Sequence, residues 1–151
     1  MALGEVVVFG NSLSDIGNLG PAAPKHPYYK GHFSNGPVYP EYLSYFQSSV
    51  LIDNAFGGAI TNGTAKSPLP LSVNANSSSF LVPNLTDQIS GHLAAFASLR
   101  LVNATAIIEI GSNNVFDLNS ASDVGAMGSA IVSGIADAIR RLQTAGYSRI
   151  L

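Results

Sequence analysis

The sequence predicts an α/β protein, a three-layer α/β/α sandwich with a mostly parallel central sheet. Two observations support this fold class. Short apolar runs alternate with longer amphipathic segments, in the order strand, helix, strand, helix, strand, helix, strand. Each of the first three apolar runs also ends in a turn rich in Gly, Asn and Ser. Because right-handed crossovers place the carboxyl ends of parallel strands at one edge, these turns should converge there.

Four apolar runs are expected to form the strands. The first is Val6 to Phe9, whose β-branched and aromatic residues indicate a strand buried on both faces. The next two cover residues 50–52 and 105–110, and a fourth opens at residues 148–151. Since that last run stops after two apolar residues, we interpret residues 1–151 as a single, incomplete domain, the N-terminal part of a larger one.

Three helices are expected between these strands. Residues 38–47 form the first, and the second begins near Leu85 with Asn84 or Thr86 as its N-cap. The third runs over 122–145 and ends at Gly146. The apolar face of the first is expected to consist of Val38, Tyr42, Leu43, Tyr45 and Phe46. In the second, the residues at helical spacing are Ile89, Leu93, Phe96, Leu99 and Arg100, and the third carries Met127, Ile131, Ile135, Ile139 and Leu142 on one face. Residues 17–36 and 61–84 are expected to be long loops.

The composition narrows the possible partners. Seven basic and nine acidic residues are scattered along the chain, which argues against nucleic acid or an anionic membrane as the main partner. No apolar run is long enough for a transmembrane segment, and there is no cysteine for disulfides or metal-thiolate sites. No cofactor and no metal are expected, and the protein is expected to be a monomer. Sequons at Asn62, Asn76, Asn84 and Asn103 favour a secreted glycoprotein whose signal peptide is absent from this chain.

The polar turns carry the candidate site residues. Ser12 follows the first strand, the Gly57-Gly58 pair follows the second, and Asn113 follows the third. Taken alone, Ser12 is more typical of a helix N-cap, Gly57-Gly58 of a turn, and Asn113 of a cap. Glu109 is unusual, because a carboxylate inside an apolar strand needs a partner, and the sequence indicates none.

Four segments, in family order, resemble the GDSL esterases and lipases, also called SGNH hydrolases. They are Phe9-Gly10-Asn11-Ser12-Leu13-Ser14-Asp15-Ile16-Gly17-Asn18, residues 33–43 (FSNGPVYPEYL), Asp53-Asn54-Ala55-Phe56-Gly57-Gly58-Ala59 and Gly111-Ser112-Asn113-Asn114. The second segment is similar to fungal and plant members. The resemblance implies the SGNH hydrolase fold with a flavodoxin-like sheet.

The resemblance also implies an acyl-transfer site and assigns its residues. Ser12 corresponds to the nucleophile, and its backbone N–H to one donor of the oxyanion hole. The N–H of Gly58 and the side-chain amide of Asn113 correspond to the other two. Three donors aimed at a developing oxyanion stabilise a tetrahedral intermediate more than the ground-state ester.

The chain departs from the family at three places. Asn11 and Asn114 stand where aspartate is usual, and the Asp-x-x-His motif that supplies the general base and its carboxylate is absent. Without a base a serine is a poor nucleophile, so this chain alone is expected to be inactive. His26 and His32, in the first long loop, are weak candidates for a substitute base, and His92 is expected on the exposed face of its helix.

Two other functions are compatible with the residues. One is a non-catalytic glycoprotein that binds carbohydrate or lipid in the cleft. The other is a flavodoxin-like phosphate binder that uses residues 10–14 as an anion loop, which is disfavoured because no basic residue lies near that turn. The leading hypothesis is a serine esterase acting on a small-molecule ester, either a lipid or an acetylated carbohydrate.

Overall fold

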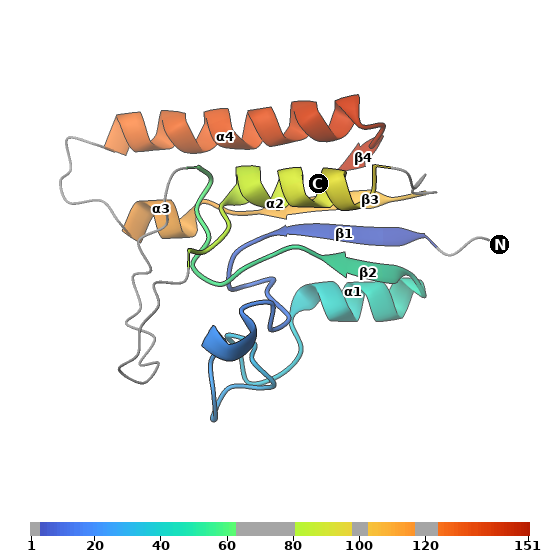
Figure 1. The fold of residues 1–151 in the computed structure, drawn as a ribbon, viewed down its shortest axis with the longest axis vertical. Helices are drawn as coiled ribbons and strands as arrows, with labels where there is room; N and C mark the ends of the chain where they lie inside the picture. Colours follow the sequence, from blue (N-terminus) through green and yellow to red (C-terminus); the bar gives the residue numbers. More distant parts are fainter. Residues whose placement is uncertain (1–3, 63–80, 98–102, 117–123) are drawn as a thin grey trace.

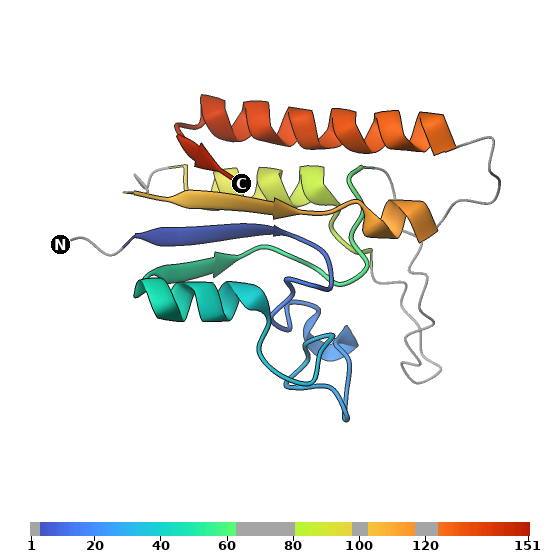
Figure 2. The ribbon, with the colours of Figure 1, turned by 180° about the vertical axis from the view of Figure 1, so that it is seen from behind.

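The computed structural model describes residues 4–62, 81–97, 103–116 and 124–151. Within them the chain forms an α/β fold with three layers, as predicted. Helix α1 (Tyr39–Gln47) covers one face of the sheet, and α2 (Leu85–Ala95) and α4 (Val124–Thr144) cover the other (Figure 1). The view from behind shows the same order of layers (Figure 2).

The sheet has four parallel strands in the order β2-β1-β3-β4. Their bounds are β1 Glu5–Gly10, β2 Val50–Asp53, β3 Thr105–Glu109 and β4 Arg149–Ile150, so all four predicted strands are confirmed. The central position of β1 explains its composition, because a parallel strand with two neighbours and helices on both faces is buried throughout. Residues Val7, Val8 and Phe9 are fully buried.

Alternate residues of β1 belong to two separate cores. Val7 and Phe9 pack with Leu85, Ile89 and Leu142, on the face covered by α2 and α4. Val6 and Val8 pack with Ile107, against Leu43 and Leu51, on the face covered by α1. The period-two alternation of a strand therefore joins both outer layers to one central strand.

The helix predictions are confirmed in position, with one exception in orientation. Helix α2 begins after the N-cap Asn84, whose side chain accepts a hydrogen bond from Asp87 N at 3.0 Å. The apolar face expected for residues 38–47 is confirmed for Val38, which is buried, and for Leu43, which packs against the sheet. It is wrong for Tyr42, Tyr45 and Phe46, which are 50%, 78% and 77% exposed.

Two shorter elements were not expected. A 3-10 turn, η1 (Gly20–Ala22), lies in the loop after β1, and α3 (Ser112–Phe116) follows β3 directly. Most of the predicted loop 61–84, together with Leu99 and Arg100, lies outside the described residues.

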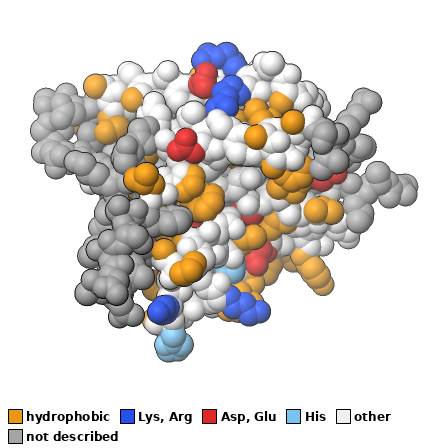
Figure 3. Space-filling view, viewed as in Figure 1, with side chains coloured by type: hydrophobic (Ala, Val, Ile, Leu, Met, Phe, Trp, Pro, Cys, Tyr) orange, Lys and Arg blue, Asp and Glu red, His pale blue; other side chains and the backbone are white. Residues whose placement is uncertain are grey.

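None of the described helices combines the length and apolarity that a membrane crossing needs. Figure 3 shows charged side chains as separate small spots on one face, without a continuous charged field.

Candidate active site at the carboxyl edge of the sheet

Three turns meet where β1, β2 and β3 end, and each carries one predicted site residue. Ser12 lies in the turn after β1, Gly58 in the loop after β2, and Asn113 in α3 after β3. The parallel register places these strand ends side by side, with Val8 opposite Asp53 and Gly10 opposite Glu109. Gly10 is required for this approach, because a Cβ there would lie 2.5 Å from the Glu109 carbonyl oxygen.

The first turn is built around the buried side chain of Asn11. Its Oδ1 accepts a hydrogen bond from Leu13 N at 2.9 Å, which forms an Asx turn with Ser12 at its centre. The Asn11 carbonyl also accepts from Ser14 N and Asp15 N, each at 3.1 Å. Ser12 itself is half-buried, and its hydroxyl makes no hydrogen bond within the described residues. The turn thus fixes the backbone of Ser12 and leaves its hydroxyl unengaged.

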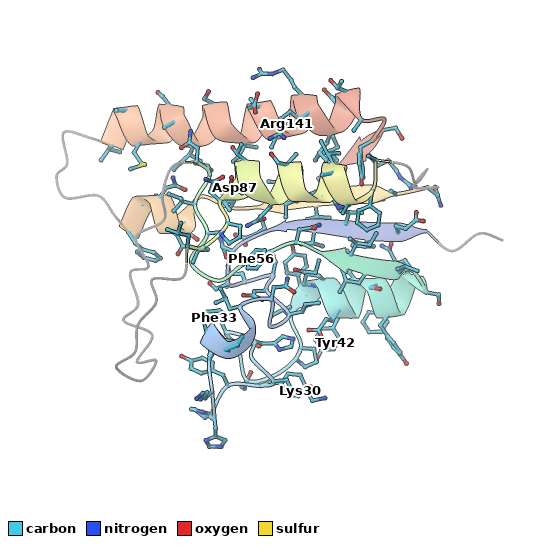
Figure 4. All side chains as sticks on the ribbon, viewed as in Figure 1. Lys30, Phe33, Tyr42, Phe56, Asp87 and Arg141 are labelled. Carbon is cyan, nitrogen blue, oxygen red and sulfur yellow. The ribbon has the colours of Figure 1, made fainter. Side chains whose placement is uncertain are left out.

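The two glycines after β2 have different roles. Gly57 N donates to Asp15 Oδ2 at 2.7 Å, and a Cβ at Gly57 would collide with the ring of Phe33 at 2.0 Å. Gly58 adopts a φ of +86°, which favours glycine, and its N–H has no hydrogen-bond partner in the described chain. Of the two, only Gly58 has a backbone donor available. Phe33 and Phe56, which are labelled in Figure 4, both pack against the same buried apolar cluster.

The third turn contributes two buried asparagines. Asn113 Nδ2 donates one proton to the carbonyl of Ala59 at 2.9 Å, which leaves its second amide proton uncommitted within the described residues. Asn114 forms two hydrogen bonds with Thr61: its Oδ1 accepts from Thr61 N and its Nδ2 donates to Thr61 Oγ1, both at 3.1 Å. Both side chains bind the turn to the loop after β2.

Hydrogen bonds close these three turns into a ring. Two hydrogen bonds join the first turn to the second: Gly57 N donates to Asp15 Oδ2, and Phe56 N donates to Gly10 O at 3.1 Å. The two asparagines join the second to the third. Asn11 Nδ2 completes the ring, because it donates to Ser112 Oγ at 3.2 Å.

Asn11 also provides the partner of Glu109, for which the sequence indicated none. Asn11 Nδ2 lies 3.4 Å from Glu109 Oε1, across the boundary between β1 and β3. Burial raises the pKa of the Glu109 carboxyl, and this hydrogen bond lowers it in part.

Sequence reasoning missed Gln88, which holds the end of β1. This buried residue of α2 accepts from Gly10 N at 2.9 Å and donates to Gly10 O at 2.9 Å. A signal was present, because Gln88 stands between Leu85 and Ile89 on the buried face of α2, where an amide requires polar partners.

A buried carboxyl, that of Asp15, and a partly buried one, that of Asp53, lie beside the first two turns. Burial raises the pKa of Asp15, although it accepts hydrogen bonds from Gly57, Asn18 and Gly17. Burial also raises the pKa of Asp53 to about 7, and the charges of Asp15 and Glu41 add to this shift. Asp53 Oδ1 accepts from Asn18 Nδ2 and Ala55 N, both at 2.9 Å. No group of three or more His, Asp or Glu side chains in the described ranges is arranged to hold a metal ion.

The three histidines have different surroundings, and the prediction for His92 is wrong. His92 is 2% exposed, with Nε2 at 2.6 Å from the Tyr147 hydroxyl and Nδ1 at 3.4 Å from Asn54 Nδ2. His32 is also buried and pairs with Glu41 at 2.9 Å, near the start of α1. His26 is exposed in the first loop. Neither buried histidine makes a hydrogen bond to Ser12.

The protein thus belongs to the parallel α/β class. At the carboxyl edge of its sheet, the turn that carries Ser12 is joined by hydrogen bonds to two further polar turns. No family model matches the chain. A protein similar to part of it is the phosphatidylcholine-sterol acyltransferase of Aeromonas hydrophila, which is 42% identical over 65 residues. The match covers 38% of this chain and 19% of that protein. This partial similarity supports a distant relationship to the GDSL-like family.

Proposed function

We propose that this chain carries the nucleophile and the oxyanion hole of a serine ester hydrolase or acyltransferase. The observation that supports this best is the ring of three hydrogen-bonded turns at the carboxyl edge of the sheet. Among the residues that the structure describes, no partner engages the Ser12 hydroxyl, the Gly58 N–H or the second Asn113 amide proton. The partial similarity to an acyltransferase supports the same class of reaction.

In the proposed reaction the Ser12 Oγ attacks the carbonyl carbon of an ester. The carbonyl oxygen becomes an oxyanion that accepts hydrogen bonds from the Ser12 and Gly58 N–H groups and the Asn113 amide. The alcohol leaves with the proton removed from Ser12, and water or a second alcohol then takes the acyl group from the serine. The hydrogen bonds between the three turns hold these donors in place before the negative charge develops on the ester oxygen, so the donors do not need to reorganise.

We propose that the general base comes from outside the 151 residues. His32 and His92 are buried and engaged with Glu41 and Tyr147, and the sequence contains no Asp-x-x-His motif. This chain alone should therefore show little or no turnover, whereas the product of the whole gene should be active.

Exposed apolar side chains next to the site residues favour an ester with an apolar acyl chain over an acetylated carbohydrate. Leu13 follows Ser12 and is 59% exposed, and Phe116, on the same short helix as Asn113, is 74% exposed. Large apolar side chains that remain in water beside a site are typical of surfaces that bind apolar ligands.

The experiment compares hydrolysis of p-nitrophenyl acetate and octanoate by the whole gene product. Ser12→Ala should abolish turnover of both esters, and Asn113→Ala should lower kcat by roughly a hundredfold, the usual effect of losing one oxyanion donor. Ser133→Ala, on the exposed side of α4, is the matched control and should act like the wild type. Equal rates for wild type and Ser12→Ala would refute the proposal, and a preference for acetate would refute the apolar acyl chain.

A further inference from the structure

Glu109 is the last residue of β3, and its side chain contacts Asn11 in the turn that presents Ser12. It is opposite Gly10 in the sheet register, and its Oε1 faces Asn11 Nδ2 at 3.4 Å. Its Oε2 is buried without a hydrogen-bond partner among the described residues. Burying a carboxylate oxygen without a hydrogen-bond partner costs free energy, so we expect Glu109 to have a role that compensates for this cost.

The surroundings of Asn11 allow its amide only one orientation. The Leu13 N–H can only donate, so it requires the Asn11 oxygen. The ionised Glu109 carboxylate can only accept, so it requires the Asn11 nitrogen. Ser112 Oγ takes the second Asn11 amide proton. A rotated amide would set Oδ1 against the carboxylate and Nδ2 against the Leu13 N–H.

We propose that Glu109 is a positioning residue that orients the Asn11 amide and thereby fixes the Asx turn that carries Ser12. This inference rests on the proposed function of Ser12. Because Asn11 also contacts Ser112, the residue before Asn113, the same amide sets the position of the nucleophile relative to the oxyanion donor. Glu109 has no contact with the ester in this arrangement and acts through Asn11.

The proposal explains why asparagine is the suitable residue at position 11 in this chain. An aspartate would still accept from Leu13 N, but its other oxygen would face the Glu109 carboxylate. Two carboxyls at such a distance share one proton, so the pair is tolerated at low pH and repels at high pH. Another titratable group that faces Glu109 is Tyr39 of α1, which interacts electrostatically with Glu109 and also with Asp53 of β2.

The test is a charge-exchange series in the whole gene product. In Glu109→Gln the amide oxygen can still accept from Asn11, so kcat should stay within threefold of wild type. In Asn11→Asp at pH 8 the two carboxylates face each other, and kcat should fall at least tenfold with KM within twofold. The double variant Asn11→Asp with Glu109→Gln restores a donor opposite an acceptor and should recover kcat to within threefold of Glu109→Gln. Asp137→Asn, an exposed carboxylate change on α4, is the control.

The pH dependence and an NMR signal separate positioning from a general loss of structure. The ratio of Asn11→Asp to wild-type kcat should rise from pH 8 to pH 5.5, whereas the ratio for the double variant should stay constant. The Leu13 amide should lose hydrogen-exchange protection in Asn11→Asp at pH 8 and regain it in the double variant. This NMR signal is measured whether or not the protein hydrolyses esters, so it tests the positioning role even if the proposed function fails. Wild-type kcat and Leu13 protection in Asn11→Asp, or a double variant as impaired as Asn11→Asp, would overturn the proposal.

Discussion

Asn114 shows how a single buried side chain at this edge tolerates a change of chemical type. It stands where the GDSL family usually has aspartate, and both of its hydrogen bonds go to Thr61. Thr61 N is a fixed donor, whereas the Thr61 hydroxyl can donate or accept. An aspartate at 114 could therefore accept from both groups, and the position does not require an amide. Asn11 differs, because its partner Glu109 only accepts.

We expect Asn114→Asp to keep the free energy of unfolding within about 1 kcal/mol of wild type, since both contacts to Thr61 survive. Asn114→Ala should cost about 1–3 kcal/mol, because the fully buried Thr61 N–H loses its acceptor. Urea unfolding at neutral pH measures both values, with the exposed Asn35→Asp as the control for the added charge. A loss in Asn114→Asp as large as that in Asn114→Ala would contradict this account.

At the scale of elements, α2 holds the end of β1 through Gln88. The strand ends at Gly10, where the chain turns away to carry Asn11 and Ser12, and the N–H of this last residue donates to a side chain of α2. Gln88 accepts from this N–H and donates to the carbonyl of the same residue. It also donates to the Pro83 carbonyl at 3.1 Å, just before α2 begins. The helix thus fixes the position from which the first turn departs.

Gln88→Ala should lower the free energy of unfolding by roughly 2–3 kcal/mol, because it leaves the buried Gly10 N–H without an acceptor. Gly10 O keeps the bond from Phe56 N, so the loss is confined to one side of the peptide. Gln143→Ala, an exposed glutamine of α4, removes the same atoms and should change stability by less than about 0.5 kcal/mol. Chemical denaturation of the two variants gives the comparison, and equal losses would rule out a specific role for Gln88.

Element positions could be predicted from the sequence because they depend on local signals. The apolar runs, the N-cap Asn84 and the stop at Gly146, with its φ of +99°, each act within a few residues. The common edge of the three turns also followed from the strand and helix order alone. The side-chain partners could not be predicted, because Glu109 and Asn11 are separated by 98 residues and their contact depends on the register of two strands.

Orientation of helices was harder to predict for the same reason. Tyr42, Tyr45 and Phe46 are apolar enough to suggest a buried face, yet α1 packs on the sheet through Leu43 and leaves them exposed. His92 was expected in water, yet it is enclosed by Phe9 of β1, Phe96 and Tyr147. Tyr147 follows α4, 55 residues away, so nothing in the α2 sequence indicates this partner.

At the scale of the whole molecule, His92 and Asp53 make the free energy of unfolding depend on pH in opposite directions. Burial lowers the pKa of His92 to about 4, below its usual 6.5, and raises that of Asp53 to about 7, above its usual 3.8. For His92 the unfolded chain binds the proton more readily, so this stabilisation is present above pH 6.5 and is lost as the pH falls toward 4. For Asp53 the folded chain binds the proton more readily, so stabilisation is present near pH 4 and is lost as the pH rises through 7. The contribution of His92 thus opposes that of Asp53, and Asp15 and Glu109, whose pKa values burial also raises, act in the same direction as Asp53.

Removing either group should therefore reveal the slope of the other. With His92→Phe, stability should rise as the pH falls from about 6.5 to 4, because Asp53 still takes up its proton. Relative to the wild type, the stability of Asp53→Asn should fall over the same range, because the uptake of a proton by folded Asp53 is lost while His92 still binds its proton only in the unfolded chain. Each slope should be at most about 1.4 kcal/mol per pH unit. The bond lost to Tyr147 in His92→Phe adds a constant penalty, since burial raises the pKa of Tyr147 to about 12, far outside this range. Urea unfolding at half-unit pH intervals measures the slopes, with the exposed His26→Gln as the control. If the plots of unfolding free energy against pH are parallel for the wild type and both variants, neither group titrates as its surroundings indicate.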